Sequence, residues 1–127
     1  MQNWILVGLG GFIGALLRYY ISGWISKSFP SFPLGTLAVN LIGSLILSTI
    51  MYSAEYYGFF TSAQRLFLTV GVLGAFTTMS TFSYETFKLL ETGEYLSFLL
   101  NIIGTLGLTL IGVYLGKIIA LSIGGIK

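Results

Sequence analysis

Hydroxyl side chains crowd one short segment in the middle of a long apolar stretch. Five of the seven residues from Thr77 to Ser83 are threonine or serine. Hydroxyl groups and β-branched threonines weaken a helix, and Gly74, just before them, permits backbone angles that other residues avoid. The segment predicts a helix break near residues 74–80, where freed backbone carbonyls could hold a small hard cation.

A second polar stripe consists of Asn40, Ser44 and Ser48, which recur at intervals of four and so share one helical face. Serines can bond back to the carbonyls of their own helix, so Ser44 and Ser48 are expected to be packing residues. The carboxamide of Asn40 cannot satisfy its four hydrogen-bonding positions locally. Asn40 is therefore either a bond between helices or a group that lines a pore.

A third stripe repeats the same spacing with Asn101, Thr105 and Thr109. Their donors could replace water around a moving anion, and bonding between helices is the alternative. Phe82, inside the polar segment, adds a ring whose edge carries positive quadrupole character and can contact an anion. These residue types are compatible with the passage of a small anion as well as with bonds between helices.

Several other chemistries are absent from the sequence. The chain contains no cysteine and no histidine, which removes disulfides, thiolate metal sites, haem ligation and imidazole catalysis. We therefore do not expect an enzyme. The net charge of +2 is scattered along the chain and forms no basic face, so nucleic acid is not an expected partner.

The elements that must position these residues are membrane helices. The chain is 55% hydrophobic and 8% charged, whereas a soluble domain carries roughly 25% charged residues. Its charges separate four apolar stretches, and about 20 helical residues cross a bilayer. We predict an all-α integral membrane protein, a single domain over residues 1–127, with spans at about 4–21, 35–54, 66–90 and 96–116, the third broken near its middle.

The positive charges are balanced between the two sides that four crossings define. Arg65, Lys117 and Lys127 fall on one side, and Arg18, Lys27 and Lys88 on the other. This gives the positive-inside rule almost no asymmetry, so we expect dual topology and an antiparallel homodimer. The alternative is that one loop decides a single orientation.

Glycines suggest how the helices pack. Gly10 with Gly14, and Gly112 with Gly116, form pairs of small residues that let helix backbones approach closely in lipid. A compact bundle of this length leaves little room for a pore inside one protomer. A dimer is again the expected working unit.

Three further segments are Gly10–Tyr19, Gly35–Asn40 and Gly71–Phe82. Together they resemble the CrcB/Fluc family of dual-topology fluoride ion channels, and the resemblance extends over essentially the whole chain. It implies a multi-pass protein of the cell membrane, working as an antiparallel homodimer with two pores. Each pore would conduct fluoride passively out of the cytoplasm and so protect the cell against fluoride toxicity.

The resemblance also implies roles for individual residues. A structural sodium ion (Na+) would lie at the dimer centre, held by the backbone carbonyls of Gly74 and Thr77. Met79 stands where the family has the first of two phenylalanines, and Arg18 would lie in an electropositive vestibule. The full set expected along the fluoride pathway is Arg18, Asn40, Met79, Ser80, Thr81, Phe82, Asn101, Thr105 and Thr109.

Two other functions stay open at this point. A proton-coupled small multidrug exporter is also a four-span, dual-topology dimer, but it needs an acidic residue deep in a span. The four acidic residues here lie near span ends or loops. The other alternative is a non-transporting membrane subunit whose polar stripes serve only assembly.

Overall fold

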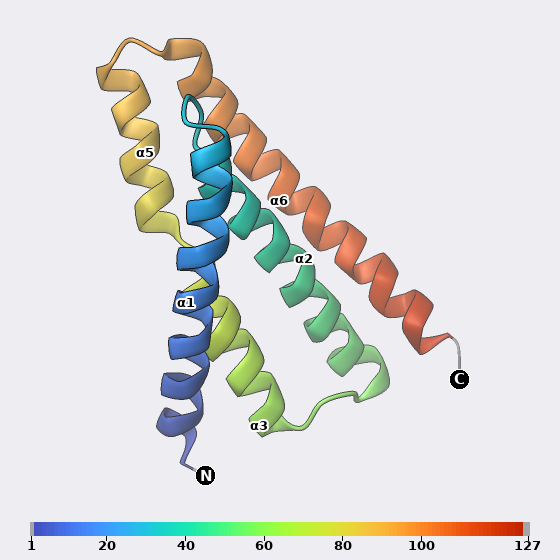
Figure 1. Ribbon diagram of the computed structural model, residues 1–127. Coiled ribbons are helices and arrows are strands. Elements are labelled where there is room, and N and C mark those ends of the chain that lie inside the picture. Colours follow the sequence, from blue (N-terminus) through green and yellow to red (C-terminus); the bar gives the residue numbers. More distant parts are fainter. Residues whose placement is uncertain (1, 126–127) are drawn as a thin grey trace.

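The computed structural model describes residues 2–125, and Lys127 lies outside them. Over these residues the protein is all-helical, without strands, and four helices are long and apolar enough to cross a membrane. They are α1 (Asn3–Ser28), α2 (Leu34–Tyr57), a composite third helix (Ser62–Glu91) and α6 (Tyr95–Gly124) (Figure 1). The predicted all-α fold with four candidate spans is confirmed. The helices run past the expected spans because charged end residues such as Lys27 and Glu55 stay within the last helical turns.

The third helix is interrupted, as the sequence predicts. It begins with α3 (Ser62–Arg65), continues as a π-helix η1 (Leu66–Leu73) and a short α4 (Gly74–Phe76), and resumes as α5 (Met79–Glu91). Between α4 and α5, Thr77 and Thr78 are extended, with φ/ψ of −86°/155° and −150°/121°. The Thr78 hydroxyl accepts a hydrogen bond from the Thr81 amide and so caps α5. The break falls within the predicted residues 74–80.

The helices form two packed pairs. α2 packs along α6, while α1 packs against η1 and α4. In Figure 1 the two pairs diverge toward the end of the molecule where both termini lie. α5 packs on α6 at the opposite end.

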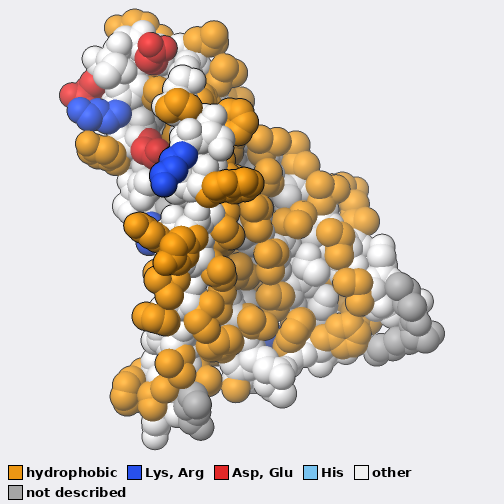
Figure 2. Space-filling model, viewed as in Figure 1, with side chains coloured by type: hydrophobic (Ala, Val, Ile, Leu, Met, Phe, Trp, Pro, Cys, Tyr) orange, Lys and Arg blue, Asp and Glu red, His pale blue; other side chains and the backbone are white. Residues whose placement is uncertain are grey.

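Few large apolar side chains are buried in this arrangement. Among the described residues, Val39, Ile50, Leu73 and Phe76 form the one core cluster. Most leucines, isoleucines and aromatic residues are on the outside, and hydrophobic side chains cover most of the face seen in Figure 2. This distribution is the one expected of helices whose outer surface faces lipid.

Glycines make the helix crossings close. A Cβ atom at Gly10 would lie 2.6 Å from the Phe67 carbonyl oxygen, and one at Gly14 would collide with the Val72 carbonyl. On the other pair, a Cβ at Gly116 would lie 2.5 Å from the Leu45 carbonyl oxygen. Backbone contact at small residues thus takes the place of a large side-chain core.

We expect Gly14→Ala to lower the stability of the protein, because the added methyl group meets backbone that cannot move aside. Overpacking of this kind costs about 1–3 kcal/mol. The matched control is Gly11→Ala, on the same helix, where a Cβ meets no atom within 4 Å. Thermal unfolding in detergent measures both, and equal melting temperatures would contradict the packing described for Gly14.

Candidate functional site

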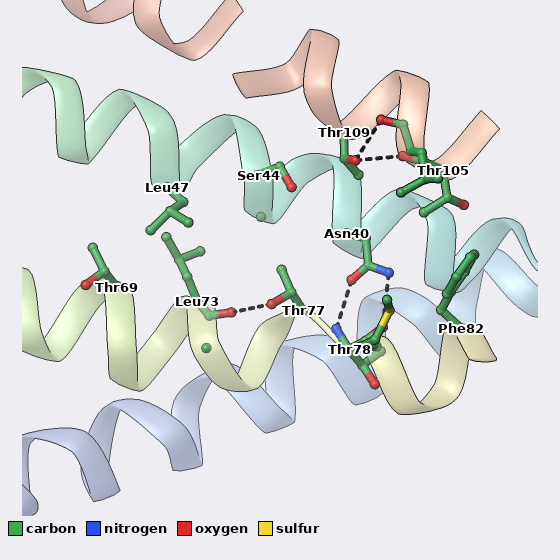
Figure 3. Close-up of a pocket in the computed structure, with 14 residues that line it drawn as sticks. Asn40, Ser44, Leu47, Thr69, Leu73, Thr77, Thr78, Phe82, Thr105 and Thr109 are labelled. Carbon is green, nitrogen blue, oxygen red and sulfur yellow. Dashed lines mark hydrogen bonds between the residues drawn. The ribbon is translucent and has the colours of Figure 1, made fainter. Parts of the chain in front are cut away.

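A cavity of about 350 Å³ lies beside the break in the third helix. The α2–α6 pair forms one wall and the third helix the other (Figure 3). Its lining consists of Asn40, Gly43, Ser44 and Leu47 from α2, of Thr69, Leu73, Gly74, Thr77, Thr78, Met79 and Phe82 from the third helix, and of Thr105, Leu106 and Thr109 from α6. The cavity is the place in the described chain where all three polar stripes meet.

The cavity brings together some of the residues expected along the pathway and leaves others out. Those that line it are Asn40, Met79, Phe82, Thr105 and Thr109, together with the two carbonyl-bearing residues Gly74 and Thr77. Those that do not line it are Arg18, Ser80, Thr81 and Asn101. The roles of both groups in ion passage stay predictions.

Asn40 bridges the break as a second peptide group would. Its Nδ2 donates to the Thr78 carbonyl at 3.1 Å, and its Oδ1 accepts from the Thr78 amide at 2.8 Å (Figure 3). In an unbroken helix that amide would donate to the carbonyl of Gly74. Asn40 therefore bonds two helices, and the second hydrogen on its Nδ2 is left for the cavity.

Arg18 lies at the break and not near a helix end. α1 continues to Ser28, ten residues farther and two residues before Pro30. The Nε of Arg18 donates to the Ala75 carbonyl at 3.0 Å in a half-buried position. The guanidinium thus satisfies a carbonyl that the break releases, and it places a fixed positive charge where the dielectric constant is low.

Ser80 and Thr81 belong to the first turn of α5. The Thr78 hydroxyl lies 3.1 Å from the Thr81 hydroxyl and 3.4 Å from the Ser80 hydroxyl. Their hydroxyls therefore form a cluster with the N-cap of α5, next to the cavity residues Thr78 and Met79. Because a helix N-terminus carries partial positive charge, this end of the cavity favours an anion.

Asn101 holds α5 against α6. It is 2% exposed, its Nδ2 donates to the Thr86 hydroxyl at 2.8 Å, and its Oδ1 accepts from Thr105 at 3.3 Å. Thr86 in turn donates to the Phe82 carbonyl at 2.6 Å. Sequence reasoning missed Thr86, although its position four residues after Phe82 places it on the same helical face as that ring.

Glu85 lies on α5 at a second, smaller cavity of about 240 Å³ under the loop that joins α1 to α2. Its carboxylate accepts a hydrogen bond from the buried hydroxyl of Thr36. Lys88 lines the same cavity. The carboxylate of Glu85 is thus paired with a donor and lies outside the larger cavity.

We expect Asn40→Ala to loosen the break, because the Thr78 amide and carbonyl would lose their partners in a half-buried place. An unpaired buried polar group costs about 1–3 kcal/mol. Hydrogen–deuterium exchange of the peptide that contains Thr78 should become faster, whereas exchange near Thr86 should not change. Asn3→Ala, at the exposed start of α1, is the control, and unchanged exchange at Thr78 would contradict the bridging role of Asn40.

Comparisons with known proteins give one consistent result. Residues 5–117 match the family model described as CrcB-like protein, Camphor Resistance (CrcB). The chain is 53% identical over 123 residues to "Fluoride-specific ion channel FluC 1" of Methanosarcina acetivorans, covering 97% of this chain and 94% of the relative. It is 50% identical to FluC 3 of Methanosarcina barkeri over 100% of both chains, and 47% identical to FluC of Methanococcus aeolicus over 97% of this chain and 98% of the relative.

Proposed function

The chain belongs to the CrcB-like protein family, and from that membership we propose that it is a fluoride-specific ion channel of the cell membrane. The observation that carries the proposal is the identity of about half of all residues, over the full length, to relatives named for that activity. The chain would act as a transporter and not as an enzyme. Passive export of fluoride would protect the cytoplasm, because HF that enters from acid surroundings dissociates inside and leaves the anion trapped.

The electrostatics of the larger cavity support an anion as the transported species. None of the described residues that line it is acidic. The positive end of α5 reaches it, Arg18 lies at the adjoining break, and Asn40 keeps a donor hydrogen. Phe82 lines the same space and offers its ring edge.

We further propose that the channel is an antiparallel homodimer with dual topology. With Arg18 bonded to the break, the sequence leaves Lys27 and Lys88 at one side against Arg65, Lys117 and Lys127 at the other, which is still close to balance. Met79 lines the cavity but is 70% exposed. A second copy placed between the diverging helix pairs would cover that side chain and complete two pores.

The carbonyls of Gly74 and Thr77 fit a structural sodium ion at the centre of such a dimer. The Thr78 amide, which would otherwise occupy the Gly74 carbonyl, donates to Asn40 instead. Both residues line the cavity, and oxygen donors suit a hard cation. With the same carbonyls of a second copy they would hold the ion, whose charge would favour anions nearby.

Fluoride release from liposomes tests the proposed function directly. Purified protein is reconstituted in vesicles loaded with fluoride and chloride, and ion-selective electrodes follow both anions after an ionophore removes the charge imbalance. We expect fluoride to leave at least 100-fold faster than chloride and far faster than from protein-free vesicles. Equal rates for the two anions, or no release above the protein-free vesicles, would overturn the proposal.

The aromatic ring at residue 82 gives a sharper prediction. Phe82→Ile should reduce fluoride release more than tenfold, because the branched alkyl group has no electropositive edge. Phe87→Ile is the matched control, since Phe87 lies on the same helix but is exposed and does not line the cavity. Met79→Phe restores the ring expected from the family and should maintain or raise release.

Gel filtration of each variant tests whether the assembly survives. Release from Phe82→Ile that matches the unmodified chain would show that the ring is not part of the pathway. Complete loss of fluoride release in Met79→Phe would show that the interpretation of position 79 is wrong.

A further inference from the structure

The hydroxyl groups that line the larger cavity differ in whether they donate a hydrogen bond within the protein. Each hydroxyl has one hydrogen to donate. Thr69 and Thr77 donate to the carbonyls of Arg65 and Leu73, at 2.7 and 3.0 Å. Thr109 donates to the carbonyl of Thr105 at 2.7 Å, and Thr105 donates to Asn101. Thr78 donates to the Thr81 hydroxyl at 3.1 Å. The hydrogens of these five threonines are already used within the protein.

Ser44 is the exception among these hydroxyl groups. It lines the cavity, it is half-buried, and the described chain offers its hydroxyl no hydrogen-bond partner. No dashed line reaches it in Figure 3. A donor without a partner beside the apolar walls of Leu47 and Leu106 is available to whatever enters the cavity.

The neighbouring serine shows that this is not a general property of the stripe. Ser48, one turn farther along α2, is 4% exposed and donates to the Val113 carbonyl of α6 at 2.5 Å. The sequence predicts a packing role for both serines, and the structure supports it for Ser48. Ser44 faces the cavity and has no such bond.

We propose that Ser44 is a fluoride-binding residue and that its hydroxyl acts together with the second Nδ2 hydrogen of Asn40. The proposal rests on the proposed function and adds a ligand to it. Residues four apart on a helix have Cβ atoms roughly 5–6 Å apart on one face. A small anion that has lost its water could be held by one donor, shared between both, and passed to the next.

The strong hydration of fluoride explains why a hydroxyl without a partner would help to bind it in this cavity. Fluoride is small and strongly hydrated, so each water that it loses must be replaced by a short hydrogen bond. The threonine hydroxyls could bind fluoride only after giving up a hydrogen bond that they already donate within the protein. Ser44 and Asn40 can donate without breaking any bond that the structure contains.

Removal of the Ser44 hydroxyl tests the proposal in the liposome assay, with fluoride release measured over a range of fluoride concentrations. Ser44→Ala should slow release at least fivefold at low fluoride and raise the concentration that gives half-maximal release. Thr49→Ala is the control: Thr49 is on the same helix, donates to its own helix carbonyl at Leu45 and does not line the cavity. Its release should match that of the unmodified chain.

Ser44→Gly removes the same hydroxyl. It replaces Ser44→Ala in the release assay if Ser44→Ala does not elute like the unmodified protein in gel filtration. Unchanged release from the well-folded variant, while the unmodified chain conducts fluoride, would overturn the role of Ser44 alone. An equal loss in Thr49→Ala would also overturn it, because the effect would not depend on the cavity. Absence of fluoride release from the unmodified chain would overturn the proposed function and this proposal with it.

Discussion

The structure depends on one constraint: backbone groups that a helix break releases inside a membrane must find partners within the protein. In this protein the released backbone groups find their hydrogen-bond partners on different helices. Asn40 of α2 takes both groups of Thr78, and Arg18 of α1 takes the carbonyl of Ala75. The break is therefore the point where α1, α2 and the third helix are joined.

This joining requires the helices to approach closely. Gly10 and Gly14 let α1 lie against the backbone of η1, and that position brings Arg18 within reach of the break. On the other side, Gly43 leaves space that the Thr77 side chain occupies. The glycines and the polar residues are thus two parts of one arrangement, since larger side chains at the crossings would separate the donors from the carbonyls that they serve.

Sequence reasoning predicted the crossings and the break because both follow from local composition. Hydropathy defines a span, and clustered hydroxyls beside Gly74 weaken a helix wherever it lies. The partners were not predictable in the same way. A spacing of four shows that Ser44 and Ser48 share a face, but only the fold shows that α6 meets one of them and a cavity meets the other. The same reason explains why Thr86, paired with a residue of another helix, was missed. No signal in Leu66–Leu73 identified the π-helix.

The π-helix has a consequence for how the chain can vary in length. A π turn accommodates more residues than an α turn, so η1 alters the direction in which every later residue of the third helix points. Loss of a single residue within Leu66–Leu73 would leave each following side chain about 100° out of register. Thr78 would then turn away from Asn40, and Phe82 away from the cavity. The lining of the larger cavity therefore depends on the number of residues in η1, and insertions or deletions that the loops tolerate would not be tolerated there.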